Sequence, residues 1–232
     1  RHFGFRPVGC WPSEGALSQE TLHLLQDAEF QWTASGGGVL GNSRHASGGG
    51  AVCIHHPFRF DASNVTCFFR DDNLSDLIGF TYSGWNEEDA ANNLLHHIHN
   101  IRAACGYAEH TIVPIILDGE NCWEHYAANG YPFLKNLYSK LIEDPDIRLT
   151  TFRDYLKTGP APTRLNKLVA GSWVYGTLST WIGDPGKNRA WDLLCQAKLD
   201  FDRVMSANTL APELQARAWE QLAICEGSDW FW

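Results

Sequence analysis

The feature that most constrains the fold is a short, nearly continuous apolar run at residues 111–117, TIVPIIL. Its residues are mostly β-branched and show no polar/apolar alternation, a pattern typical of a strand whose two faces are both covered by helices. Asp118 follows the run at once, and Gly119 lets the chain turn away at little steric cost. Because the carboxyl ends of such strands face the active site, Asp118 is a candidate functional residue.

Strand-like and helix-like segments alternate along the chain, which predicts an α/β protein with a parallel barrel or sheet. A weaker run at residues 5–10 leads to Glu14. Further strands are expected at residues 30–34, 65–70 and 147–152. Helices are expected over about ten residues after Ser18, at 74–80, from Asn86, at 131–142, at 185–204 and at 212–225. The Gly/Ser-rich stretch between Gly36 and Gly50 lacks the GKS or GKT ending of a phosphate loop, so a flexible surface loop is expected there.

Composition excludes several classes of protein. The 232 residues carry a net charge of −9 with only 18 Lys plus Arg, which argues against nucleic-acid binding. No run approaches the roughly 18 apolar residues of a membrane span, so a soluble protein is expected. The seven cysteines are odd in number and form no CxxC pair, which indicates reduced thiols in a cytoplasmic protein and neither a disulfide framework nor a zinc knuckle.

The ten tryptophans are the outlier, and many adjoin Gly, Pro or acidic residues. About half are expected in the core, and the others suit a sugar-binding cleft, where an aromatic face meets the apolar face of a pyranose.

Two carboxylates are the strongest candidates for chemistry. Glu14 and Asp118 each follow a predicted strand, and acids in such places serve either as helix caps and ion-pair partners or as a catalytic pair. His96 and His99 have the spacing of two metal ligands on a helix, but they lie opposite the apolar stripe of their helix, so no metal and no cofactor is expected. No serine lies in a GxSxG elbow.

Five motifs together resemble glycoside hydrolase family 57, which contains α-amylase, amylopullulanase, 4-α-glucanotransferase and branching enzymes. The motifs are residues 11–15 (WPSEG), 69–80 (FRDDNLSDLIGF), 117–121 (LDGEN), 179–184 (STWIGD) and 226–232 (EGSDWFW). The resemblance implies a (β/α)7 barrel followed by a helical region that closes over the cleft. It also implies retaining chemistry on α-glucans, with Glu14 as nucleophile and Asp118 as general acid/base.

The resemblance also suggests which residues contact the glucan. These are Trp11, Arg70, Glu120, Trp123, Trp181, Glu226, Asp229 and Trp230. Trp11 suits the core equally well, and Asp71 and Asp76 suit helix caps. Residues 1–160 are expected to form the C-terminal part of the barrel, and residues 161–232 the helical region. The family's N-terminal His-Gln-Pro motif does not occur here, so a partial barrel and a chain truncated at both ends are expected.

Three functions remain open from the sequence. The first is an α-amylase-like hydrolase with an α-glucan as partner, and the second is a 4-α-glucanotransferase or branching enzyme on the same scaffold. The third is a non-catalytic carbohydrate-binding homologue or an inactive fragment.

Overall fold

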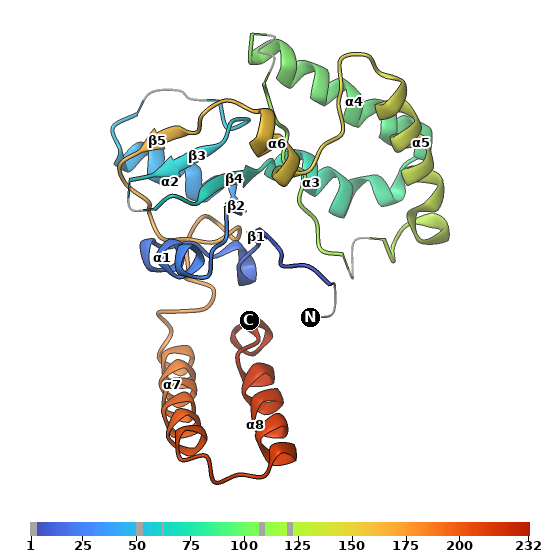
Figure 1. The fold of residues 1–232 in the computed structure, drawn as a ribbon. Coiled ribbons are helices and arrows are strands. Elements are labelled where there is room, and N and C mark those ends of the chain that lie inside the picture. Colours follow the sequence, from blue (N-terminus) through green and yellow to red (C-terminus); the bar gives the residue numbers. More distant parts are fainter. Residues whose placement is uncertain (1–3, 50–52, 62, 107–109, 120–122) are drawn as a thin grey trace. The chain divides into compact units, whose positions relative to one another are not determined.

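The computed structural model describes every residue except 1–3, 50–52, 62, 107–109 and 120–122. The chain folds into two compact units, Arg1–Gly176 and Thr177–Trp232. The first unit combines a sheet with helices and the second is helical (Figure 1). The predicted α/β class is therefore confirmed.

A five-stranded sheet with the order β1-β2-β4-β3-β5 lies at the centre of the first unit (Figure 1). The strands are β1 (Gly9–Cys10), β2 (Trp32–Gly36), β3 (Phe58–Phe60), β4 (Thr66–Arg70) and β5 (Thr163–Leu165). Strands β1, β2 and β4 are parallel, β3 is antiparallel to β4, and β5 is parallel to β3. Since Gly36 pairs with Arg70, β2 and β4 end at the same edge of the sheet.

The predicted helices are largely present. The helices of the first unit are α1 (Gln19–Asp27), α2 (Gly37–Ala46), α3 (Asp72–Asp76), α4 (Glu87–Ala104), α5 (Tyr131–Glu143) and α6 (Phe152–Thr158), of which α2 and α6 were not predicted. A π-helical turn, Leu77–Thr81, continues α3. Side chains cap the helix starts as the sequence suggests: Ser18 accepts from Thr21 N–H, and Asn86 accepts from the N–H groups of Glu88 and Asp89.

The expectation of a flexible loop after Gly36 was wrong, because residues 37–46 form α2. Val39, Leu40 and Ser43 are fully buried against the sheet, so tertiary packing outweighs the low helix propensity of the glycines. The Asp72 carboxylate also accepts from the N–H of Gly37 at 3.0 Å, which satisfies a donor at the start of this helix.

Two predicted strands were also wrong. Residues 111–118 adopt no regular strand, although Asp71 N–H donates to Pro114 O at 2.8 Å and Ile112 N–H donates to His55 O at 3.0 Å. Pro114 has no N–H to donate, which interrupts any ladder at its centre. Residues 147–151 are likewise irregular, and Thr151 caps α6 by accepting from Asp154 N–H.

The first unit has separate apolar cores. One packs α1 and α2 against the sheet around Phe58, Phe60 and Phe69. Another joins α3, α4 and α5 around Tyr82, Leu94 and Phe133, and α4 and α5 lie side by side (Figure 1). The first of these cores supports the strand ends that carry the candidate site.

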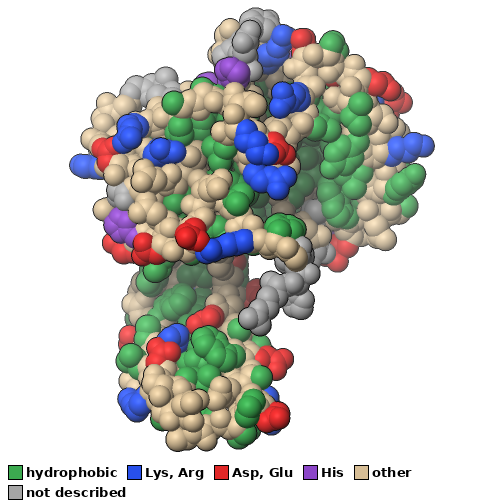
Figure 2. All heavy atoms as spheres, in the orientation of Figure 1, with side chains coloured by type: hydrophobic (Ala, Val, Ile, Leu, Met, Phe, Trp, Pro, Cys, Tyr) green, Lys and Arg blue, Asp and Glu red, His purple; other side chains and the backbone are tan. Residues whose placement is uncertain are grey.

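The second unit consists mainly of α7 (Pro185–Ser206) and α8 (Pro212–Cys225), which lie side by side (Figure 1). Trp191 stacks on Phe231 at a centroid distance of 3.9 Å, and Phe201 meets the edge of Trp219 at 4.7 Å. Apolar side chains are also exposed on this unit (Figure 2). Among the described helices, none combines the length and hydropathy that crossing a bilayer requires.

Candidate active site

Glu14 lies just beyond β1 in a single 3₁₀ turn, Ser13–Gly15. Its backbone has φ 56° and ψ 22°, a left-handed conformation that is uncommon for a residue with a side chain. Hydrogen bonds hold the backbone on both sides, from Gly15 N–H to Pro12 O at 2.9 Å and from Trp173 N–H to Glu14 O at 3.2 Å. Residues kept in such conformations cluster at functional sites, which makes Glu14 the first candidate.

Trp173 holds the side chain of Glu14. Its indole N–H donates to Glu14 Oε2 at 2.9 Å, and its ring meets the edge of Trp11 at a centroid distance of 5.4 Å. The segment around Trp173 is fixed by a bridge in which Leu17 and Gly171 exchange hydrogen bonds of 2.8 and 3.0 Å. Trp173 was not among the predicted site residues, because it adjoins Ser172 and Val174 and lies in none of the five motifs.

Glycines allow the close approach of this segment to the strand ends. A Cβ on Gly36 would lie 2.5 Å from Trp173 Cα, and one on Gly15 would lie 2.7 Å from the Trp11 ring. Gly15 also has a φ of +57°. The positions next to Glu14 and at the end of β2 therefore require glycine both for space and, at Gly15, for conformation.

Arg70 ends β4 with its side chain buried, and its guanidinium lies 5.3 Å from the centre of the Trp173 ring. It donates from Nη1 to Asp72 at 3.1 Å and from Nη2 to Asp76 at 2.7 Å. Nε donates to the carbonyl of Ile116 at 2.9 Å. Arg70 therefore connects Trp173, the hydrogen-bond partner of Glu14, to the segment that leads to Asp118.

Asp118 is half-buried and follows Ile116 by two residues. Ile116 is fixed at both polar backbone atoms, since its N–H donates to Ser75 Oγ at 3.2 Å and its carbonyl accepts from Arg70. The chain thus approaches Asp118 along the end of β4, although without a regular strand.

Asp71, expected either as a cap or as a site residue, caps α3 by accepting from Leu74 N–H at 3.0 Å. Its other oxygen lies 2.8 Å from His55 Nε2. Burial opposes ionisation of Asp71, but the hydrogen bonds from His55 and Leu74 outweigh it and hold the pKa of this carboxyl below its ordinary value. Burial raises the pKa of neighbouring Asp72 in spite of its bond from Arg70.

A cleft of about 590 Å³ opens beside Arg70, and His55, Asp71 and Asp72 are in its lining. Glu14 and Asp118 are not among the residues that line it. The cleft therefore borders the candidate site on the side of α3 and α4.

Of the other predicted site residues in the first unit, the structure describes Trp123 in a different core. Trp123 packs on Tyr126 and Phe133 at centroid distances of 5.5 and 6.4 Å, so it belongs to the core of α4 and α5. Glu120 lies outside the described residues.

The remaining predicted contacts, Trp181, Glu226, Asp229 and Trp230, belong to the second unit. There Trp181 meets the edge of Trp232 at 5.3 Å, while Glu226, Asp229 and Trp230 are exposed. Within the first unit, the structure therefore groups Trp11, Glu14 and Arg70 around Trp173.

Solved structures of known enzymes share this fold. A GH57-type branching enzyme from Pyrococcus horikoshii is 18% identical with a TM-score of 0.71, over 97% of this chain and 49% of that one. A GH57 branching enzyme from Thermococcus kodakaraensis is 16% identical with a TM-score of 0.68, over 90% of this chain and 48% of the other. A 4-alpha-glucanotransferase from Thermococcus litoralis is 17% identical with a TM-score of 0.59, over 86% of this chain and 30% of that one.

This chain thus spans less than half the length of these enzymes. The fold they share is the (β/α)7 barrel, of which this chain carries a part. No curated protein matches the sequence significantly. The sequence model of Glycosyl hydrolase family 57 matches residues 1–167, which is most of the chain, and it covers the three motifs around Glu14, Arg70 and Asp118. The chain therefore belongs to glycosyl hydrolase family 57.

Proposed function

We propose that the protein containing this chain is a retaining enzyme acting on α-glucans, with Glu14 as nucleophile and Asp118 as general acid/base. The observation that carries the proposal is the hydrogen bond from Trp173 to Glu14, at a residue with left-handed backbone just beyond a parallel strand. A nucleophile needs one fixed side-chain position, and the half-buried Trp173, which packs beside Glu14 and donates a hydrogen bond to it, supports such a position.

The reaction has two steps. The Glu14 carboxylate attacks the anomeric carbon, the glycosidic C–O bond breaks, and Asp118 gives its proton to the leaving oxygen. Asp118 then takes a proton from water or from a sugar hydroxyl, whose oxygen displaces Glu14 from the anomeric carbon. Retention requires the two carboxyl groups about 5–5.5 Å apart in the complete protein.

Substrate contacts are proposed for Trp11, Arg70, Glu120 and Trp123, and for Trp181, Glu226, Asp229 and Trp230 of the second unit. Aromatic rings suit the apolar faces of glucose units, and the charged groups suit their hydroxyls. For the two parts of the chain we propose the roles that the sequence suggests. Residues 1–160 form part of the barrel, and residues 161–232 cover the cleft.

The experiment uses the whole protein with variants Glu14→Ala and Asp118→Asn. Glu14→Ala should lose turnover, and added azide should restore release of an activated leaving group and give a glycosyl azide of configuration opposite to that of the substrate. Asp118→Asn should lose far more activity on maltooligosaccharides than on dinitrophenyl glycosides, which need no acid assistance. The exposed acids Glu213 and Asp192 provide matched controls, Glu213→Gln and Asp192→Asn.

A second candidate is transfer instead of hydrolysis, and the names of the similar structures favour it, since they are branching enzymes and a 4-alpha-glucanotransferase. Incubation with maltooligosaccharides separates the two: longer or branched products indicate transfer, and reducing ends alone indicate hydrolysis. Unchanged turnover in Glu14→Ala would overturn the catalytic assignment. Glucan binding without turnover in the wild-type protein would support the non-catalytic homologue.

A further inference from the structure

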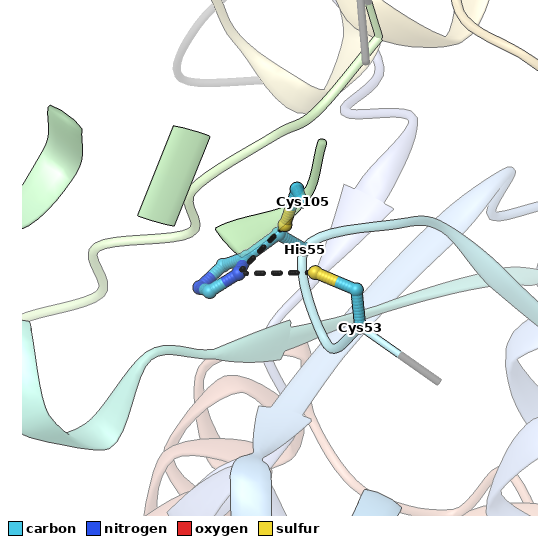
Figure 3. Close-up of side chains that lie close together, drawn as sticks. All are labelled: Cys53, His55 and Cys105. Carbon is cyan, nitrogen blue, oxygen red and sulfur yellow. Dashed lines mark hydrogen bonds between the residues drawn. The ribbon is translucent and has the colours of Figure 1, made fainter. Parts of the chain in front are cut away.

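Two thiols and an imidazole converge between the loop before β3 and the end of α4. Cys53 Sγ lies 3.4 Å from His55 Nδ1, and Cys105 Sγ lies 3.9 Å from the same nitrogen (Figure 3). All three atoms lie within 4.8 Å of one another. Cys53 is two positions from His55 in the sequence, whereas Cys105 is 50 positions away.

These separations match the ligand set of a tetrahedral zinc ion. With Zn–S bonds of about 2.3 Å and Zn–N bonds of about 2.0–2.1 Å, tetrahedral angles put the sulfur and nitrogen ligands about 3.6 Å apart and two sulfur ligands about 3.8 Å apart. The two observed S···N distances, 3.4 and 3.9 Å, fall on either side of the expected value. Little rearrangement is therefore needed for one ion to bind all three atoms.

Asp71 orients the imidazole for this role. Its Oδ2 lies 2.8 Å from His55 Nε2, and the side chains of His55 and Asp71 are only 10% and 8% exposed. When Nε2–H donates to this carboxylate, Nδ1 keeps its lone pair and points it at the two sulfur atoms. Metal-binding histidines usually have such a carboxylate partner on the other ring nitrogen.

The surroundings also favour a cation. Cys105 caps the C-terminus of α4, an 18-residue helix, so the negative end of its dipole lies beside the cluster. His55 and Asp71 line the cleft described above, together with Ile54, Ile101 and Ala104. The cleft gives a path for an ion and room for water, while the apolar residues limit competition from bulk solvent.

We propose that Cys53, His55 and Cys105 bind one Zn²⁺ ion through two thiolates and the Nδ1 imidazole nitrogen, with water in the fourth position. On binding, each thiol releases its proton to solvent, and two thiolates balance the charge of the ion. The ion ties the loop before β3 to the end of α4 and, through Asp71, to the start of α3. This site is separate from the glycosidase proposal and does not depend on it.

The test measures zinc in the whole protein, purified under reducing conditions from a zinc-supplemented culture. Elemental analysis should give one zinc per chain after desalting, and Co²⁺ exchanged into the site should show a thiolate charge-transfer band. Cys53→Ser and Cys105→Ser should each lose the metal and the band, whereas Cys195→Ser, which changes an exposed thiol, should keep both. Asp71→Asn should weaken zinc binding by about 10- to 100-fold, as measured against a chromophoric chelator.

A measurement on the wild-type protein covers the case in which these variants fail to fold. Zinc should protect Cys53 and Cys105 from iodoacetamide, while the exposed Cys195 and Cys225 react equally with and without it. Absence of stoichiometric zinc, equal zinc in the double variant Cys53→Ser/Cys105→Ser, or a Cys53–Cys105 disulfide under reducing conditions would each overturn the proposal.

Discussion

Trp173 donates its indole N–H to Glu14 Oε2 at 2.9 Å, across 159 positions of sequence. The same ring packs against Trp11 and lies beneath the guanidinium of Arg70. One tryptophan therefore fixes the carboxylate that we propose as nucleophile and connects it to the end of β4.

Trp173→Phe should keep the ring but remove the donor. A hydrogen bond to a charged group contributes about 1.5–3 kcal/mol, so kcat should fall by about 10- to 100-fold with a smaller change in KM. Steady-state kinetics of the whole protein on maltooligosaccharides measure this. Trp219→Phe, which alters a half-exposed tryptophan of α8, is the control and should leave kcat unchanged. Equal kcat values for Trp173→Phe and wild type would show that the hydrogen bond does not position Glu14.

Gly36→Ala should destabilise the protein, because its Cβ would lie 2.5 Å from Trp173 Cα, a backbone atom that cannot move alone. Forced overpacking of this kind costs about 1–3 kcal/mol. The matched control is Gly41→Ala within α2, where nothing lies within 4 Å of the new Cβ. Alanine stabilises a helix interior relative to glycine. Gly41→Ala should therefore raise the free energy of unfolding by about 0.5–1 kcal/mol. Urea denaturation of both variants measures the two changes in unfolding free energy. Equal changes for Gly36→Ala and Gly41→Ala would contradict the close approach of Trp173 to Gly36.

Arg70→Met should cost about 1.5–3 kcal/mol of unfolding free energy, because it removes the charge-assisted hydrogen bonds that the buried guanidinium donates to Asp72 and Asp76. The double variant Arg70→Met/Asp72→Asn should recover at least about 0.5 kcal/mol, the usual lower limit of coupling between contacting residues. The exposed pair Lys198–Asp202 on α7 is the comparison and should show coupling of only about 0.3–0.5 kcal/mol. If the coupling between Arg70 and Asp72 is no larger than this, the ion pairs of Arg70 do not hold the end of β4.

Asp144 should make stability depend on pH. The backbone N–H of Asp146 lowers the pKa of Asp144, with further contributions from His99, whose Nε2 lies 2.7 Å from Asp144 Oδ2, and from Arg102. Because the folded-state pKa lies below the unfolded value of about 3.9, the stabilisation is complete above that pH and is lost as pH falls through the folded-state pKa.

Asp144→Asn should therefore reduce stability at pH 6 and converge with the wild type as the pH falls below about 4. Chemical denaturation at a series of pH values measures the difference. Asp192→Asn, which replaces an exposed acid on α7, is measured beside it as the matched substitution. If the difference in unfolding free energy between Asp144→Asn and wild type stays the same at every pH, Asp144 is not the source of the pH dependence.

Local signals in the sequence located most helices. Ser18 and Asn86 cap their helices as expected because a cap is a contact within a few residues. The helix over 37–46 was missed because its stability comes from burial of Val39 and Leu40 against the sheet, a contact that composition does not reveal. The apolar run at 111–117 was predicted as a strand, but its described backbone hydrogen bonds, with Asp71 just beyond β4 and with His55, are single contacts and form no ladder.

The candidate site was predictable only in part. Glu14, Arg70 and Asp118 lie in motifs that resemble those of the family, whereas Trp173 and the Cys53–His55–Cys105 cluster carry no motif. Their partners are far apart in sequence, and no local pattern encodes a contact of that kind.

Periodicity, helix caps and contiguous motifs were enough to predict the α/β class, most of the helices and membership in glycosyl hydrolase family 57. The folded chain was needed to see that Trp173 holds Glu14, that Arg70 joins Trp173 to the segment before Asp118, and that Cys53 and Cys105 meet at His55. Side-chain hydrogen bonds and metal-ligand distances require atoms within a few ångströms, and folding is what brings residues so far apart in sequence together.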